Sequence, residues 1–391
     1  MIIKYSLLIL IIFLVGCSKE QAIIEEVAEI QPTFKETSIQ LYINEQLDLA
    51  VYEPAEGVYL GVYSQDIDYF ENTLDTEMAF RVMQYTVNDP VTSIDILDCI
   101  ANQQLPYVKY LFDDTEPITS LYYLIGDIST TSTRYSTPIF IELYPLTQNV
   151  TNPIEYKEKF QEAYQIIKKY IPEAVIVWSL DYSEIEDIYM FYPGDDVVDW
   201  VGLNIYMYKY FDNELVDYDI SDNIDLWYKT FQSTKPLMIT GLGISSFSQI
   251  DHTYYIADAK NKLKYFYEEM LDCYPRIKGI LYSDVDMRKV GGVDDFRISI
   301  DFDIIDYVSN LWQNERFLTQ VTVSGDESMQ YISYTLPAYI YDEMYYIEDI
   351  YLQTIIPPNI TKSIDSIKDL EGTIYYNIDD ILVYIDGYYR T

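Results

Sequence analysis

The sequence predicts an α/β fold, because apolar strands alternate with amphipathic helical segments along most of the chain. The clearest strand is residues 197–206, which follow a Pro193-Gly194 turn and end in polar Asn204 and Tyr206. A strand that is apolar at almost every position is typical of a parallel sheet covered by helices. The neighbouring apolar runs are residues 174–181, 235–243 and 277–286. Strands and helices in this order indicate α/β winding.

The first half of the chain continues the alternation. A helix is expected at residues 94–104. The best-defined helix starts after Asn152, which can cap its N-terminus, and has Pro153 at its first position. Apolar residues recur at helical spacing from Ile154 to Ile171. The strands expected in this half are residues 56–63, 78–85, 105–112 and 137–144.

The alternation stops after about residue 317. Short Tyr- and Ile-rich runs follow, and they predict a small β-rich C-terminal accessory domain over residues 318–391. Within it, residues 345–350 resemble residues 376–381, which indicates two related hairpin or strand–helix units.

One stretch carries a family resemblance. Residues 191–206 have the sequence FYPGDDVVDWVGLNIY. With the order of the surrounding segments, it resembles glycoside hydrolase family 26, the β-mannanase-like barrels, whose members carry a similar Tyr-Pro-Gly-Asp-Asp-x-Val-Asp-Trp-Val-Gly motif. The resemblance implies a (β/α)8 TIM barrel over residues 56–317, with its chemistry at the carboxyl ends of the strands.

The same resemblance implies retaining hydrolysis of β-linked mannan or related glucans, with a glutamate acid/base on strand four and a glutamate nucleophile on strand seven. Glu142 matches the acid/base position, but Ile141 and Tyr144 replace polar neighbours of the family pattern. Gly241 stands at the nucleophile position, and no acidic residue occurs from residue 236 to 250. The nucleophile is therefore predicted to be lost.

Other residues at the expected strand ends are candidates for binding the substrate. They are Tyr144, Trp178, Asp181, Asn204, Tyr206, Asp284 and Asp286. Together they would place carboxylate, amide and aromatic groups around one mouth of the barrel.

Three functions remain open. The leading hypothesis is a catalytically degenerate barrel that binds β-linked polysaccharide or a cell-wall glycan, with Glu142 either kept as an acid or buried against a tyrosine or backbone group. The second is an active β-mannanase or β-glucanase with an atypical second carboxylate. That inverting enzyme would place Asp181, Asp284 or Asp286 about 6.5–9.5 Å from Glu142. The third is a structural or adhesion protein of the cell surface.

Composition restricts the partners further. The chain has 64 Asp and Glu against 25 Lys and Arg, so it would repel nucleic acid but not neutral polysaccharide. The 43 tyrosines could stack on sugar rings as well as fill cores. His252 is the single histidine, which excludes multi-histidine zinc sites. We expect no cofactor and no dedicated metal site, although Asp-rich loops could bind calcium.

The start of the chain has the order of a secretory signal. Lys4 precedes an apolar run that ends in Leu14-Val15-Gly16-Cys17, which resembles a bacterial lipobox. We expect residues 1–17 to be a lipoprotein signal peptide and residues 18–55 an acidic tether that leads into the barrel. The protein would then lie in the bacterial cell envelope, anchored to the membrane through Cys17 and facing outside the cytoplasm. The alternative is a buried N-terminal strand with an incidental cysteine.

Two further cysteines follow in the predicted barrel. Cys99 and Cys273 fall on separate helices that are not expected to be neighbours. A disulfide requires close Cα atoms, so both thiols are predicted to be free.

Overall fold

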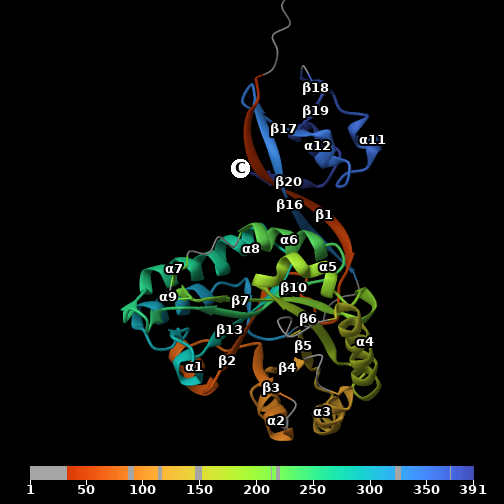
Figure 1. Ribbon diagram of the computed structural model, residues 1–391. Coiled ribbons are helices and arrows are strands. Elements are labelled where there is room, and N and C mark those ends of the chain that lie inside the picture. Colours follow the sequence, from red (N-terminus) through yellow and green to blue (C-terminus); the bar gives the residue numbers. More distant parts are fainter. Residues whose placement is uncertain are drawn as a thin grey trace, which may run out of the picture.

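The computed structural model shows a large barrel with a smaller sheet domain at one end (Figure 1). It describes residues 33–86, 92–112, 117–145, 152–212, 214–216, 221–321, 327–369 and 371–391. The signal-like segment and Cys17 lie outside the described residues. Within the described residues, none of the helices combines the length and apolar character that crossing a membrane requires.

Eight parallel strands form the barrel, and each overlaps a strand predicted from the sequence. They are β2 (Val58–Ser64), β3 (Phe80–Tyr85), β4 (Leu105–Phe112), β5 (Phe140–Pro145), β6 (Val175–Asp181), β7 (Trp200–Met207), β10 (Leu237–Ile244) and β13 (Ile277–Asp284). Pairing of β13 with β2, from Gly279 opposite Tyr59 to Asp284 opposite Ser64, closes the barrel. The predicted (β/α)8 fold is therefore confirmed.

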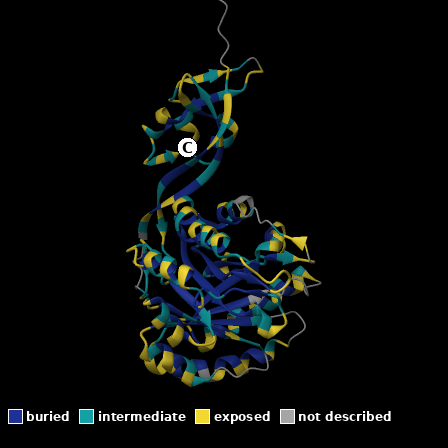
Figure 2. Cartoon of the chain, turned by 90° about the vertical axis from the view of Figure 1, so that its left-hand side faces the viewer, coloured by how far each residue is buried: buried dark blue, intermediate teal, exposed yellow. Residues whose placement is uncertain are grey.

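Helices surround the strands, and their outer faces are exposed while the strands are buried (Figure 2). Asn152 caps the long helix as predicted, because its side chain accepts hydrogen bonds from the backbone N–H groups of Ile154 and Glu155. The helices are α1 (Ile67–Leu74), α2 (Ser93–Ala101), α3 (Leu121–Tyr135), α4 (Pro153–Tyr170), α5 (Ile188–Phe191), α6 (Ser221–Phe231), α7 (Ile256–Lys264), α8 (Met270–Cys273) and α9 (Phe302–Trp312).

Successive side chains of each barrel strand point alternately inward and outward. Inward-facing residues such as Tyr107, Phe140 and Trp200 form a core inside the barrel. Outward-facing residues form a second, larger core against the helices. Cys99 and Cys273 lie on α2 and α8 with free thiols, as predicted.

The small domain is a mixed unit of one sheet and three short helices. Its strand order is β18 (Ser366–Lys368), β19 (Ile374–Asn377), β17 (Met344–Glu348), β16 (Glu327–Tyr341), β1 (Lys35–Asp48) and β20 (Gly387–Arg390). Its helices are α10 (Asp349–Leu352), α11 (Pro358–Thr361) and α12 (Ile378–Leu382). The two similar segments are both strand–helix units, β17–α10 and β19–α12, and their strands pair antiparallel.

Strand β1 corrects the interpretation of residues 18–55 as a tether. Residues 35–48 pair with β16 along their whole length, from Lys35 opposite Ile340 to Asp48 opposite Glu327. Ile39, Leu41 and Ile43 enter the core of the small domain. The prediction was wrong here because the partner of this strand lies almost 300 residues further along the chain.

The small domain contacts the barrel through the β1–β16 ribbon. Ser333 on β16 accepts a hydrogen bond from Gln232 Nε2 at 2.7 Å and donates one to the carbonyl of Cys273 at 2.6 Å. The segment after β1 then covers the amino-terminal end of the barrel strands, where Trp200 Nε1 donates to the carbonyl of Val51 at 3.0 Å. Beside it, Arg276 and Glu53 form a two-bond ion pair at 2.9 and 3.1 Å. Both side chains are fully buried.

This ion pair gives a stability prediction. Glu53→Gln leaves the Arg276 guanidinium buried without its counter-charge, and we expect the free energy of unfolding to fall by about 3–5 kcal/mol in urea titrations. The control is Arg316→Gln, which removes the partly exposed pair with Asp272 (3.0 Å) and should cost about 1 kcal/mol or less. Equal losses for the two variants would contradict the importance of the buried pair.

Candidate functional site

A cleft opens at the carboxyl ends of the barrel strands. Its volume is about 420 Å³. Its aromatic wall consists of Tyr63, Tyr206 and Tyr208, and the amides of Gln65 and Gln84 face it. The remaining lining residues are Lys109, Leu111, Ser283, Val285, Met287 and Val290. None of the described lining residues is Asp or Glu.

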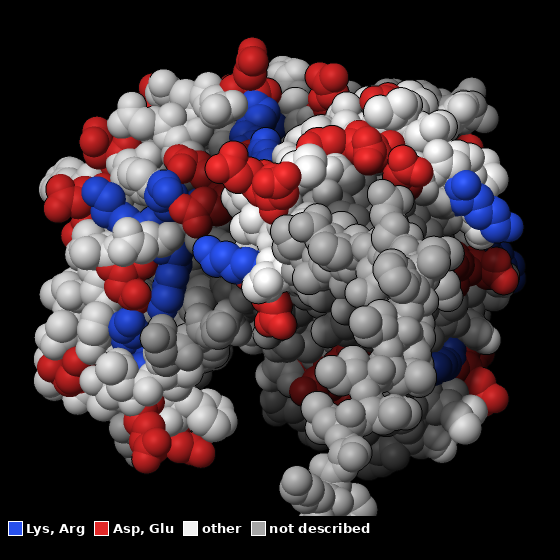
Figure 3. Space-filling model, turned by 90° about the horizontal axis from the view of Figure 1, so that it is seen from above, with Lys and Arg blue, Asp and Glu red and all other residues white. Residues whose placement is uncertain are grey.

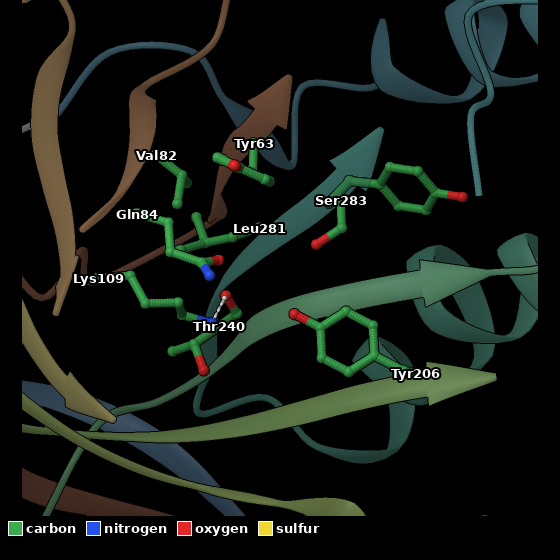
Figure 4. A pocket seen from close by; sticks show the side chains of 9 residues that line it. Tyr63, Val82, Gln84, Lys109, Tyr206, Thr240, Leu281 and Ser283 are labelled. Carbon is green, nitrogen blue, oxygen red and sulfur yellow. Dashed lines mark hydrogen bonds between the residues drawn. The ribbon is translucent and has the colours of Figure 1, made fainter. Parts of the chain in front are cut away.

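The floor of the cleft narrows around Lys109, Tyr206 and Thr240 (Figure 4). Lys109 Nζ donates hydrogen bonds to Asn204 Oδ1 at 2.6 Å and to the carbonyl of Thr240 at 3.1 Å. It also lies 3.4 Å from Glu142 Oε2. The Lys109 ammonium therefore contacts three oxygen atoms, from Asn204, Thr240 and Glu142.

Glu142 lies beneath this floor and is completely buried. Its carboxylate accepts hydrogen bonds from Tyr107 at 2.9 Å, from Ser179 and from the Asn204 amide at 3.4 Å. Glu142 is therefore a charge-balancing carboxylate in a closed network. The interpretation of Glu142 as buried against a tyrosine fits this geometry, whereas an acid/base would have to reach the cleft.

The protonation states follow from the same contacts. Burial lowers the pKa of Lys109, but Glu142, Tyr206 and Asp181 together raise it, so its pKa lies above the ordinary value for lysine. Burial, followed by the charge of Glu142, raises the pKa of Tyr107 well above its ordinary value. Lys109 therefore stays charged and Tyr107 stays a hydrogen-bond donor at neutral pH.

Gly241 faces the cleft-forming side chains of β7. A Cβ atom at this position would lie 2.6 Å from Asn204 Oδ1 and 2.7 Å from the Tyr206 hydroxyl oxygen. Any larger residue would have to displace Tyr206, which already fills the space. The structure therefore has no room for a carboxylate at position 241 while Tyr206 keeps its position.

The carboxylates of Asp284 and Asp286 are bound by residues of the segment that follows β13. Asp284 accepts hydrogen bonds from the backbone N–H groups of Ile298 and Ser299, at 2.7 and 3.1 Å, and from the Ser299 hydroxyl at 2.7 Å. Burial raises its pKa although these hydrogen bonds lower it. Asp286 pairs with Arg288 at 2.7 Å and Arg297 at 3.2 Å, and its hydrogen bond with Arg288 lowers its pKa. Neither residue lines the cleft.

The other residues predicted to bind substrate are Trp178, Asp181 and Tyr144. Trp178 points outward from β6 and packs against Tyr192 and Phe231, with ring centroids 5.1 and 6.1 Å away. Its prediction as a substrate-binding residue was wrong, because a strand that is buried on both faces does not reveal which residues face the barrel interior. Asp181 ends β6 and does not line the cleft. The side chain of Tyr144 lies outside the described residues.

Of the predicted residues, Tyr206 lines the cleft and Asn204 supports its floor. Tyr63, Gln84 and Lys109 also line the cleft and were not predicted from the sequence. Lys109 had a recognisable signal, since it is the only charged residue in the apolar strand 105–112, just as Glu142 is in its own strand.

The fold is similar to those of solved enzyme structures. No family model matches the sequence, and no curated protein matches it either. The fold is similar to that of glycoside hydrolase family 26. A modular endo-β-1,4-mannanase of this family from Cellulomonas fimi has a TM-score of 0.51 and 11% identity, covering 84% of this chain and 98% of its own. At this identity, the likeness concerns the fold.

A second neighbour is β-glucuronidase 2 from Bacteroides uniformis, with a TM-score of 0.51 and 12% identity. The similar region covers 70% of this chain and 37% of that enzyme. Both neighbours are glycoside hydrolases by name. The mannanase supports the resemblance to family 26, and the two neighbours together support a glycoside-hydrolase-like barrel.

The buried network gives a second prediction. Glu142→Gln and Lys109→Met each leave one buried charge without its partner, and each should lower the free energy of unfolding by about 3–5 kcal/mol. The double variant should lose less than the sum, because it removes both charges. Chemical denaturation of the four proteins in a double-mutant cycle measures the coupling.

A matched control is Lys264→Met, which removes the exposed pair with Glu269 (2.6 Å) and should leave stability unchanged. Strictly additive losses for Glu142→Gln and Lys109→Met would show that the two side chains do not depend on each other.

Proposed function

We propose that this protein is an extracytoplasmic lipoprotein whose glycoside-hydrolase-like barrel binds neutral β-linked polysaccharide without hydrolysing it. One observation carries the proposal: the described lining of the cleft combines three tyrosines with amide and hydroxyl groups and has no carboxylate. Tyrosine rings offer flat apolar faces to sugar rings, and amides can donate to and accept from sugar hydroxyls.

Hydrolysis by this class of barrel needs two carboxyl groups that face the same glycosidic bond. Glu142 is closed off beneath the floor by its hydrogen bonds to Tyr107 and Ser179. Position 241 is filled by Tyr206, and the Asp284 and Asp286 carboxylates are bound to loop residues. Asp181, the third acid proposed for this role, does not line the cleft either. The alternative of an active hydrolase therefore has no cleft-lining second carboxylate among the three residues proposed for it.

A neutral ligand agrees with the charge of the protein. Acidic side chains are spread over the face seen from above, with Lys and Arg side chains among them (Figure 3). The formal net charge of −39 would repel nucleic acid and other polyanions at long range. Neutral mannan or glucan carries no such penalty.

Anchoring through Cys17 would give the small domain a role as a spacer. Strand β1 begins at the end of the small domain that lies away from the barrel (Figure 1). Residues 18–32 would connect this end to the lipid, so the barrel would face away from the membrane. This part of the proposal rests on the lipobox-like sequence before Cys17.

The binding proposal is tested by titration calorimetry with β-mannan, β-glucan and xylan, alongside an assay for reducing sugar. We expect binding without any release of reducing sugar above a heat-inactivated sample. Tyr206→Ala should weaken binding by about tenfold, and Gln84→Ala should weaken it by less. Tyr384→Ala, on the small domain, is the control and should bind like the wild type. Reducing sugar released by the wild-type protein would contradict catalytic silence.

The anchor is tested by expression in a bacterial host with radiolabelled palmitate. The wild-type protein should carry label and sediment with membranes. Cys17→Ala should lose the label, since the acyl chains would be attached to this cysteine. Equal labelling of the two proteins would remove lipid attachment at Cys17 from the proposal.

A further inference from the structure

An exposed aromatic ring lies on a short hairpin at the carboxyl end of the barrel strands, the end at which the cleft opens. Strands β11 (Phe247–Ser248) and β12 (Thr253–Tyr254) follow β10 at the carboxyl end of the barrel. Phe247 lies opposite Tyr254, and their ring centroids are 4.7 Å apart. Phe247 is 9% exposed, whereas Tyr254 is 65% exposed. Tyr254 thus presents ring surface to solvent while resting on a buried ring.

The base of this ring pair is fixed by charged groups. The guanidinium of Arg288 lies 4.9 Å from the centre of the Phe247 ring. Arg288 is itself held by Asp286 and Asp295, each at 2.7 Å. Strand β14 (Asp294–Asp295) pairs with β11, so Asp295 also lies opposite Phe247 in the small sheet.

The turn of the hairpin is fixed as well. The carboxylate of Asp251 accepts hydrogen bonds from the hydroxyl of Tyr210 at 3.0 Å, from the hydroxyl of Tyr255 and from the backbone N–H of Thr253 at 3.2 Å. These hydrogen bonds hold the residues on both sides of Tyr254, and the Phe247 ring supports the Tyr254 ring. A ring that is already ordered loses little conformational entropy when a ligand binds to it.

The hairpin adjoins the cleft through one helical turn. The turn Met287–Val290 supplies Arg288 to the hairpin and supplies Met287 and Val290 to the cleft wall. Val290 is 65% exposed, so it lies at the rim of the cleft. The Met287–Val290 turn thus connects the cleft wall to Phe247, the ring that supports Tyr254.

We propose that Tyr254 is a second sugar-stacking position, which binds units of the same polysaccharide that extend beyond the cleft. The inference rests on the proposed glycan binding and adds its direction and length: the ligand is a chain that crosses the Met287–Val290 turn. The charged groups beneath the Phe247 ring are paired, since Asp286 and Asp295 form ion pairs with Arg288 and Arg297, which suits an uncharged chain.

Calorimetry with β-1,4-linked manno- and gluco-oligosaccharides of two to six units tests this position. Tyr254→Ala should weaken binding of the longest oligosaccharides and of the polymer by about fivefold to tenfold, and leave disaccharide binding unchanged. Tyr254→Phe should bind like the wild type at every length, because stacking uses the ring and not the hydroxyl. Tyr384→Ala controls for the loss of an exposed tyrosine elsewhere.

The outcomes separate the two proposals. Wild-type binding that Tyr254→Ala leaves unchanged at all lengths would overturn the role of Tyr254 and leave the cleft proposal standing. Equal weakening at all lengths would also overturn it, because the loss would then lie in the cleft. A wild-type protein that binds none of these sugars would overturn the proposed function and the inference with it.

Discussion

Lys109 and Glu142 are register partners on adjacent parallel strands, so both side chains point into the barrel and face each other. Burying two charges is costly unless each is paired and hydrogen-bonded. Tyr107, Ser179, Asn204 and the carbonyl of Thr240 supply the further partners. The network therefore connects β4, β5, β6, β7 and β10. It also forms the floor of the cleft.

This arrangement decides the chemistry above it. The Glu142 carboxylate is buried and paired with Lys109. The described lining of the cleft therefore consists of tyrosine rings, amides, a hydroxyl, aliphatic side chains and the paired Lys109. The close approach of Tyr206 to Gly241 completes the change, because the phenol occupies the space that a side chain at 241 would need. The described cleft therefore presents a partly aromatic surface without carboxylates.

The two domains are joined more closely than a tail and a barrel would be. Strand β1 comes before the barrel in sequence but lies inside the small sheet, between β16 and β20. The chain then crosses the amino-terminal end of the barrel and buries Glu53 against Arg276. This crossing seals one end of the barrel with a charge pair, while the cleft stays open at the other end.

The elements and their order follow from local signals in the sequence. Apolar runs of strand length, the Asn152-Pro153 cap and the stretch 191–206 were enough to predict the eight strands, the best-defined helix and the family resemblance, because these signals are local in the chain. The roles of the polar residues depend on contacts between strands that are distant in the sequence. Glu142 has a structural role because Lys109 lies opposite it on the neighbouring strand. Trp178 packs against Phe231 of α6 because its side chain points outward from β6. The place of β1 was also decided by tertiary structure, since a strand's partner is chosen by the sheet that can bury its apolar face and not by nearness in sequence.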